Sequence, residues 1–401
     1  MKYLYLIFSL FFFSFIKAES IHTTTIPGNN NTNKIIANTA SNSRPEKSEF
    51  RKKLDKFNKT MEKAVKKFPL PVISYSTTTK WLFGLTKINS FRIGAEKPDD
   101  TTIQPSHITE LAYFTQNKQY KIVVSANLMF GDNKYESISK LMVINFPTLF
   151  FGVGNNTEAE KRCILDTRNV ATSQVFMYNF SERFYFGLKY DFNYYWKVDT
   201  LDYRCSLSEN QVTGLRENEG FQSGLGMSIS RETRDNRFNA RRGSYINIGY
   251  MGYFKWLGSN FVYNSFTLDL RKYVTPVKWL TIAGQFYTEA KYGDVPVQSL
   301  ALMGGANHMR GVYIGRFRDK TKIEAQLEMR FPIVWILGGT VFTGLGQVGP
   351  DYQSYSLKGT KWSYGAGLRL MVDQSTRTNM RFDLGFFEGS PQFFFTFSEA
   401  F

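Results

Sequence analysis

The sequence predicts an all-β fold, a single transmembrane antiparallel β-barrel of about sixteen strands. One observation is the aromatic content, which at 16 % of 401 residues suits a barrel wall with aromatic girdles facing lipid. A second is the alternation of apolar and polar residues, which recurs along most of the chain after residue 70. A third is that no long apolar run follows residue 16, which excludes a helical membrane protein.

The alternation is clearest between residues 322 and 331. One face carries Ile323, Ala325, Leu327, Met329 and Phe331, and the other carries Glu324, Gln326, Glu328 and Arg330. Because so many strands show the same division, we expect the apolar faces to contact lipid and the polar faces to line a wet lumen. A loop with a Gly-Gly pair and an Arg-Gly pair precedes this strand. We expect that loop to lie above the barrel mouth or inside it.

Period-two alternation bounded by turn residues predicts the other strands in order. The first half of the chain contains 72–78, 81–92, 108–115, 120–130, 135–146, 172–180 and 184–196. The second half contains 222–232, 244–255, 261–274, 280–291, 322–331, 339–347, 362–372, 379–386 and 392–398. Long connections such as 147–171 and 292–321 alternate with short ones such as 181–183, with 93–107 as an exception. This asymmetry predicts long extracellular loops, short periplasmic turns and both barrel ends on the periplasmic side.

The first residues indicate the compartment. Lys2 precedes a short apolar stretch, and Ala18 is a suitable cleavage site, so residues 1–18 are predicted to be a signal peptide. We therefore expect the protein to be exported to the bacterial outer membrane, where it contacts lipid. Residues 19–45 show no periodicity and predict a flexible leader. The barrel is expected to occupy residues 70–401.

Between the leader and the barrel, residues 46–68 predict a basic amphipathic helix that ends before Pro69. Its apolar stripe is formed by Phe50, Leu54, Phe57, Met61 and Val65, with lysines and an arginine between them. Three positions remain open: against the barrel's own rim or lumen, on the periplasmic membrane surface, or against a partner protein.

Composition argues against nucleic-acid binding and against catalysis. The net charge is +16, but the basic residues alternate with apolar ones or lie in the amphipathic segment, and they predict no compact basic face. The three histidines, His22, His107 and His308, have no metal-ligand neighbour at a useful spacing, so no metal site is predicted. No nucleophile, base and orienting group occur together, and no phosphate-binding glycine loop is present. We expect neither an enzyme nor a cofactor.

The two cysteines, Cys163 and Cys205, fall in the predicted third and fourth extracellular loops. The exported compartment is oxidising, so a disulfide between these neighbouring loops is predicted. The alternative is two unpaired thiols in the loops.

Several segments carry a family resemblance. They are 151–157 (Phe-Gly-Val-Gly-Asn-Asn-Thr), Thr-Arg-Asp-Asn at 233–236 followed by Arg-Gly at 242–243, Gly-Gly at 304–305, Met-Arg-Gly at 309–311, and Glu328 four residues before Pro332. In this order the sequence resembles the bacterial surface antigen family over roughly residues 70–401. That family comprises the BamA- and TamA-type outer-membrane assembly barrels and the two-partner secretion translocators.

The resemblance implies a sixteen-stranded barrel whose first and last strands pair poorly and can part. The sixth outer loop would fold into the lumen as a latch, with Arg310 and Gly311 at its tip and Glu328 as the acidic partner of Arg310. A final strand ending in an aromatic residue also resembles the insertion signal of outer-membrane barrels. The expected seam residues are Val72, Ile73, Ser74, Tyr75, Phe395, Thr396, Phe397 and Phe401.

Two departures from the family pattern affect these expectations. The family's second acidic partner lies in a Phe-x-Asp-x-Gly motif on the thirteenth strand, where this chain has Phe342 and Gly344, so the latch is expected to be looser. The family's periplasmic POTRA repeats have no counterpart in the roughly fifty residues before the first strand. The sequence therefore resembles a short member without POTRA domains.

Two main functions remain open. In the first, the barrel assists a polypeptide, or a lipid, in entering or crossing the outer membrane through the seam between its first and last strands. In the second, it is a structural subunit that holds a periplasmic or outer-membrane protein partner through its helix or loops. A passive pore is a lesser alternative, because an inserted loop would narrow the lumen.

Overall fold

The computed structural model describes residues 68–401 apart from 77–79, 95–103, 117, 201–214 and 374–376. The predicted signal peptide, leader and all but the last residue of the basic helix lie outside the described residues. The described residues fall within one compact unit that spans 56–401. No helix in this part of the chain has the length and apolar content needed to cross a membrane.

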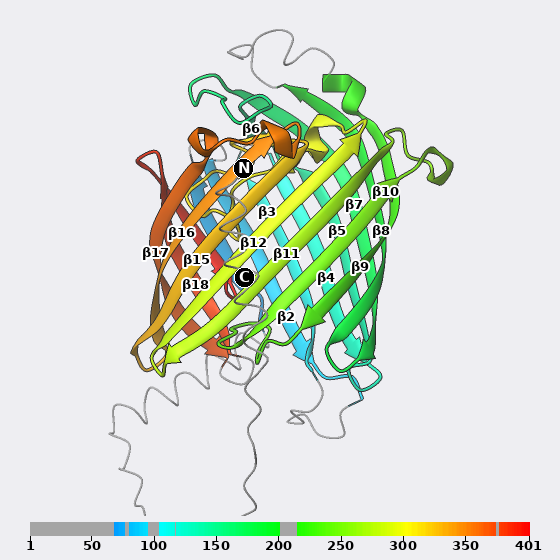
Figure 1. Ribbon diagram of the computed structural model, residues 1–401. Helices are drawn as coiled ribbons and strands as arrows, with labels where there is room; N and C mark the ends of the chain where they lie inside the picture. Colours follow the sequence, from blue (N-terminus) through cyan, green and yellow to red (C-terminus); the bar gives the residue numbers. More distant parts are fainter. Residues whose placement is uncertain (1–67, 77–79, 95–103, 117, 201–214, 374–376) are drawn as a thin grey trace, which may run out of the picture. The chain divides into compact units, whose positions relative to one another are not determined.

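The unit is built on one antiparallel sheet of sixteen main strands, in which consecutive strands are paired (Figure 1). The first eight are β1 (Leu70–Ser76), β2 (Lys80–Phe91), β3 (Ser106–Thr115), β4 (Tyr120–Phe130), β5 (Tyr135–Asn145), β7 (Cys163–Ser181), β8 (Phe184–Thr200) and β9 (Gly220–Glu232). The others are β10 (Gly243–Tyr253), β11 (Tyr263–Val277), β12 (Leu280–Gly293), β15 (Thr321–Val334), β16 (Leu337–Gly349), β17 (Lys361–Asp373), β18 (Thr378–Phe387) and β19 (Ser390–Phe397). The predicted all-β, barrel-like fold is confirmed.

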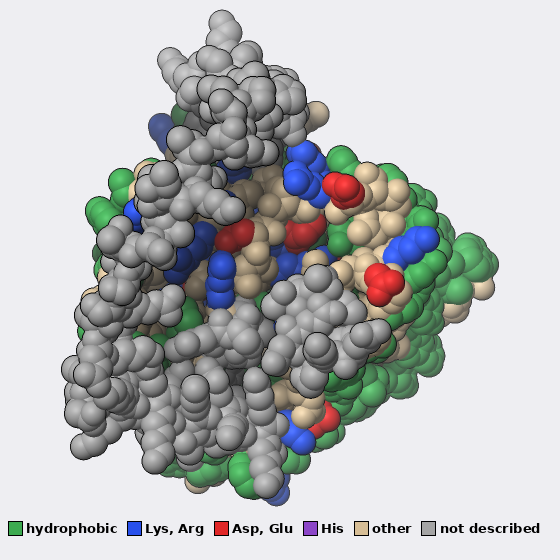
Figure 2. Space-filling view, turned by 90° about the horizontal axis from the view of Figure 1, so that it is seen from below, with side chains coloured by type: hydrophobic (Ala, Val, Ile, Leu, Met, Phe, Trp, Pro, Cys, Tyr) green, Lys and Arg blue, Asp and Glu red, His purple; other side chains and the backbone are tan. Residues whose placement is uncertain are grey.

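The sheet divides its side chains as the alternation predicts. On β15, Leu327 and Met329 are exposed on the outer face, whereas Glu328 and Arg330 are buried on the inner face. Seen from below, hydrophobic side chains form most of the visible outer rim, and charged side chains lie in the hollow that the rim encloses (Figure 2). The division is weaker on β3, β4 and β5, whose inner faces carry apolar residues such as Leu111, Val123 and Met142.

One hairpin extends further than expected. β7 begins at Cys163 and β8 ends at Thr200, so their ladder continues past the predicted ends at 172 and 196. The short strand β6 (Thr148–Phe150) pairs with the start of β7. The extension is stabilised by an apolar cluster of Phe150, Leu165, Val198 and Leu215. Part of the predicted third loop is therefore strand.

The sheet does not close into a complete barrel. Among the described residues, no backbone pairing joins β1 to β19, although each is fully paired on its other side. β1 is only seven residues long and covers residues 80–86 of β2, so residues 87–91 of β2 pair with β3 alone. We call this interruption the seam.

Candidate functional site

The loop between β12 and β15, the predicted sixth outer loop, turns back into the interior of the sheet. It contains a 3-10 turn, η3 (Val297–Ser299), and a two-residue hairpin of β13 (Ala301–Leu302) and β14 (Arg318–Asp319). Arg310 at its tip is only 1 % exposed. Buried apolar residues of the loop, Met303, Met309, Val312 and Phe317, pack with Val348 and Phe387 of the sheet.

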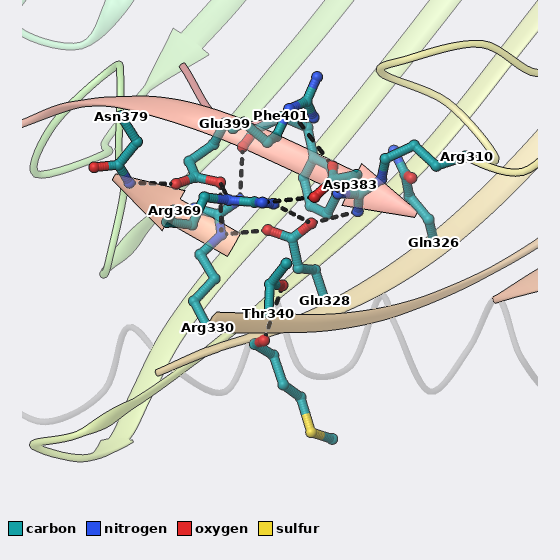
Figure 3. Close-up of polar contacts among 12 residues, drawn as sticks. Arg310, Gln326, Glu328, Arg330, Thr340, Arg369, Asn379, Asp383, Glu399 and Phe401 are labelled. Atoms are coloured by element: carbon teal, nitrogen blue, oxygen red, sulfur yellow. Dashed lines mark hydrogen bonds and ion pairs between the residues drawn. The ribbon is translucent and has the colours of Figure 1, made fainter. Parts of the chain in front are cut away.

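Arg310 is held by carboxylates from two strands (Figure 3). Its Nη2 donates to Glu328 Oε2 on β15, and its Nη1 donates to Asp383 Oδ2 on β18 at 2.7 Å. The guanidinium group lies 3.7 Å from the ring centroid of Phe342. A buried guanidinium is costly unless it is paired and hydrogen-bonded, and both conditions are met here. We call Arg310, Glu328 and Asp383 the latch.

The latch is part of a larger ionic network. Glu328 accepts from Arg330 Nε at 2.6 Å, and Asp383 accepts from Arg369 Nη1 at 2.6 Å. Arg369 Nε donates to Glu399 Oε2 at 2.7 Å, and Arg381 Nε lies 3.6 Å from Asp383 Oδ2. The network thus joins four guanidinium groups and three carboxylates from the loop tip, β15, β17, β18 and the segment after β19. It connects the loop tip to the β17–β19 side of the seam.

Asp383 was missed by sequence reasoning, which looked for the second acid at Gly344 on β16. In the structure the space beside Gly344 is taken by Met309, whose Cγ would lie 3.2 Å from a Cβ at that position. The acid comes from β18 instead, so the latch has two acidic partners despite the departure from the family motif. The Asp-x-Gly spacing of Asp383 and Gly385 on a polar face was the available signal.

Because Gly311 has no side chain, the tip of the sixth outer loop can approach the sheet closely. The φ of Gly311 is +107°, a conformation that L side chains rarely adopt, and an added Cβ would lie 2.7 Å from the backbone nitrogen of Phe386 on β18. A glycine at this position therefore lets the backbone of the loop lie directly against the backbone of β18.

The third outer loop is hydrogen-bonded to the sixth and to the seventh. Gly154 N donates to Arg318 O at 2.8 Å, and Arg316 Nη1 donates to Thr157 Oγ1 at 2.6 Å. Asn155 Nδ2 donates to the carbonyl of Gly359, in the seventh outer loop, at 2.7 Å. Burial lowers the pKa of Arg318 to about 10. The segment 151–157, singled out by its family resemblance, thus ties three outer loops together.

The end of the chain leaves the seam and enters the interior. After β19, Ser398 has a φ of +65°, and Glu399 N donates to the carbonyl of Phe238 at 3.4 Å. Burial favours a raised pKa for Glu399, but Arg330 and Arg369 outweigh it and lower that pKa below its usual value. Phe401, expected at the seam, is 5 % exposed and packs with Ala240, Tyr273 and Ala283, while its carbonyl accepts from Arg330 Nη2 at 3.0 Å.

The other expected seam residues lie on β1 and β19, the two strands that are not paired with each other. Val72, Ile73, Ser74 and Tyr75 belong to β1 and pair with residues 81–84 of β2. Phe395, Thr396 and Phe397 belong to β19 and pair with residues 380–382 of β18. Phe395 is exposed, and Thr396 Oγ1 accepts from Arg381 Nε at 2.8 Å, which links the strand edge to the network.

The remaining expected sites are only partly described. Cys163 is 2 % exposed and disulfide-bonded, but Cys205 lies outside the described residues, so their pairing stays a prediction. The helix residues Phe50, Leu54, Phe57, Met61 and Val65 also lie outside the described residues. His308 packs against Tyr287 with its Nδ1 3.5 Å from Glu324 Oε2, an arrangement that positions the loop. Within the described ranges no group of His, Cys, Asp and Glu could hold a metal ion.

Comparison with known proteins gives one family. The Omp85 superfamily domain matches residues 89–401. BamA from Haemophilus ducreyi lacking POTRA domains 1–3 is 12 % identical, with 86 % of this chain and 77 % of that chain covered and a TM-score of 0.49. CdiB from Acinetobacter baumannii is 11 % identical, with coverages of 79 % and 55 % and a TM-score of 0.48. CdiB from Escherichia coli is 8 % identical, with coverages of 86 % and 67 % and a TM-score of 0.49. No curated protein matches the sequence.

Proposed function

Because this chain belongs to the Omp85 superfamily, a group of outer-membrane assembly or transport barrels rather than enzymes, we propose that it assists a polypeptide or a lipid across or into the outer membrane. The route is the seam between β1 and β19. The observation that carries this proposal is the absence of backbone pairing between these two strands among the described residues.

An unpaired strand edge presents backbone donors and acceptors to whatever lies beside it. β1 has seven residues and β19 has eight, whereas β7 and β8 have 19 and 17. Because no ladder joins β1 to β19 among the described residues, no ladder hydrogen bond between them has to be broken for the two strands to move apart. Lipid cannot form hydrogen bonds with these backbone groups. A client strand that adds to either edge would supply those hydrogen bonds.

The latch supports the same route from inside. Loop-tip Arg310 is joined through Asp383 and Arg369 to Glu399, just beyond β19. A shift of the loop tip therefore changes the pairing of charges next to one side of the seam. The inserted loop also narrows the lumen, which favours lateral passage over a central pore.

A photo-crosslinking experiment tests whether clients contact the seam. A photoreactive amino acid is placed at Ile73 or Phe395 on the seam strands. The matched control carries it at Phe266 on β11, a strand that is paired with a neighbour on both sides. We expect adducts with exported polypeptide or lipid at the seam positions, several times more abundant than at Phe266. The readout is mass spectrometry of adducts formed in cells.

Equal labelling at all three positions would contradict the proposal, because it would indicate unspecific contact. Adducts confined to one stable protein, unchanged when export is blocked, would favour the alternative of a non-transporting subunit that holds a partner. That outcome would also direct attention to residues 46–68 as the partner-binding segment.

A further inference from the structure

The outward face of β2 and β3 carries a pair of opposite charges, whereas the outward face of β9 and β10 exposes apolar side chains such as Met227 and Ile248. Lys87 on β2 faces the same way as Trp81, Phe83 and Leu85, because residues two apart share a face. Glu110 on β3 shares the face of the exposed Phe114 and is itself exposed. The two residues lie directly opposite each other in the ladder. An antiparallel pair of this kind forms one compact patch.

The patch lies within the lipid-facing band rather than at its edge. On β2, exposed aromatic residues lie on either side of Lys87, Trp81 toward one end and Phe91 toward the other. On β4, Val124 lies opposite Glu110, between Tyr120 and Phe130 at the two ends of the strand. Aromatic girdles mark the two membrane interfaces of such barrels, so the charged pair is expected between the interfaces.

Polar side chains continue across the same wall. Ser139 Oγ on β5 donates to Gln174 Oε1 on β7, and Gln174 Nε2 donates to Ser137 Oγ at 2.9 Å. These residues share the outward face of Leu141 and Phe176. The corresponding face of β9 and β10 instead exposes Leu225, Met227, Ile229 and Ile248. The polar residues therefore distinguish the β2–β7 wall from the opposite one.

Charged side chains on a lipid-facing surface are expensive and usually mark an interaction. None of the ion pairs found in the described part of the chain involves Lys87 or Glu110. Lipid tails offer no partner for either group. A protein surface that places a carboxylate on Lys87 and a cation on Glu110 would remove both costs at once.

We propose that this wall binds a second copy of the chain, through reciprocal ion pairs between Lys87 of one protomer and Glu110 of the other. Two opposite charges on neighbouring strands make a patch that is complementary to itself across a two-fold axis. A partner of a single sign would leave one of the two groups unpaired. Ala126, on the same outward face and beside the patch on β4, is small enough to let two walls approach closely.

Charge exchange tests this proposal. Two differently tagged copies of the full-length protein are expressed together, and their co-purification is measured after extraction into lipid nanodiscs. Wild-type copies should co-purify. Lys87→Glu alone, or Glu110→Lys alone, puts like charges across the interface and should reduce co-purification about tenfold or more. When one tagged copy carries Lys87→Glu and the other carries Glu110→Lys, opposite charges face each other again and co-purification should recover.

The mixed-variant recovery separates pairing between copies from pairing within one copy, because each single variant keeps two like charges on its own wall. Lys272→Glu makes the same charge change on the outward face of β11 and should leave co-purification unchanged. Heat-modifiable gel mobility reports that each variant is folded. Failure of wild-type copies to co-purify, full co-purification by the folded single variants, or no recovery in the mixture would each overturn the proposal.

Discussion

Replacing Arg310 with alanine is expected to release the tip of the sixth outer loop from the interior while the sheet stays assembled. The substitution leaves Glu328 and Asp383 buried without the guanidinium that lies between them. Removing one partner of a buried ion pair typically costs about 3–5 kcal/mol of folding free energy. That is a large fraction of the free energy that keeps a single loop tip docked. The sheet itself is held by backbone ladders that do not involve Arg310. The proposed transport role should be lost with the docked tip.

Limited proteolysis of the purified barrel measures the first effect. Cleavage within 303–315 should appear in the Arg310→Ala variant and be absent from the wild type, with gel mobility of the folded barrel unchanged. Arg310→Lys serves as the control, since it retains the charge but replaces the planar guanidinium, which offers a separate nitrogen to each carboxylate, with a single ammonium nitrogen, and its effect should be intermediate. A variant that keeps the loop protected and performs its cellular role at a normal barrel level would contradict both the latch and the transport proposal.

Replacing Asp383 with asparagine is expected to weaken the whole network rather than the loop tip alone. Asp383 contacts Arg310 at 2.7 Å and Arg369 at 2.6 Å and is fully buried. The four guanidinium groups would then face two carboxylates instead of three. Uncompensated buried charge is costly, so we expect a loss of about 3–5 kcal/mol together with release of the tip. Denaturant unfolding followed by gel mobility measures the change.

Gly344→Asp provides a contrast for this variant, because it places an acid at the position the family motif uses. The added Cβ would lie 3.2 Å from Met309 Cγ, so the side chain has to displace Met309. We therefore expect the combination of Gly344→Asp with Asp383→Asn to remain as unstable as Asp383→Asn alone. Recovery of stability in the combined variant would show that the position of the acid is interchangeable, contrary to the packing described here.

The alternation of apolar and polar residues predicted most strands and the inner-facing side chains, because a strand's two faces depend only on the local periodicity of the sequence. It identified β15 correctly and placed Glu328 on the inner face. Family resemblance then linked Glu328 to Arg310, eighteen residues earlier. Asp383 is 73 residues from Arg310, and nothing in a strand pattern says which inner-facing residues meet across the interior. The second acidic partner was expected at Gly344 on β16, where the family motif has it, but this chain supplies Asp383 from β18.

The end of the chain could not be predicted for a related reason. The alternation predicted a last strand that ends at residue 398, and Phe401 was expected at the seam because a terminal aromatic residue resembles the insertion signal of outer-membrane barrels. The chain instead turns at Ser398, and its last residues are held inside by contacts with Arg330 and Tyr273, which lie far away in the sequence. Contacts of that kind appear only when the sheet has brought β11, β15 and the chain end together.

The central claim, that the seam opens during function, is tested most directly by locking it in cells. Cysteines at Ser74 on β1 and Thr396 on β19 would join the two strands, with neighbouring pairs examined in parallel because no ladder fixes their register. Cys163 and Cys205 are replaced by serine in the parent, which serves as the control. The account predicts that oxidation abolishes the cellular role and that a reductant restores it. A locked barrel that works normally would contradict it.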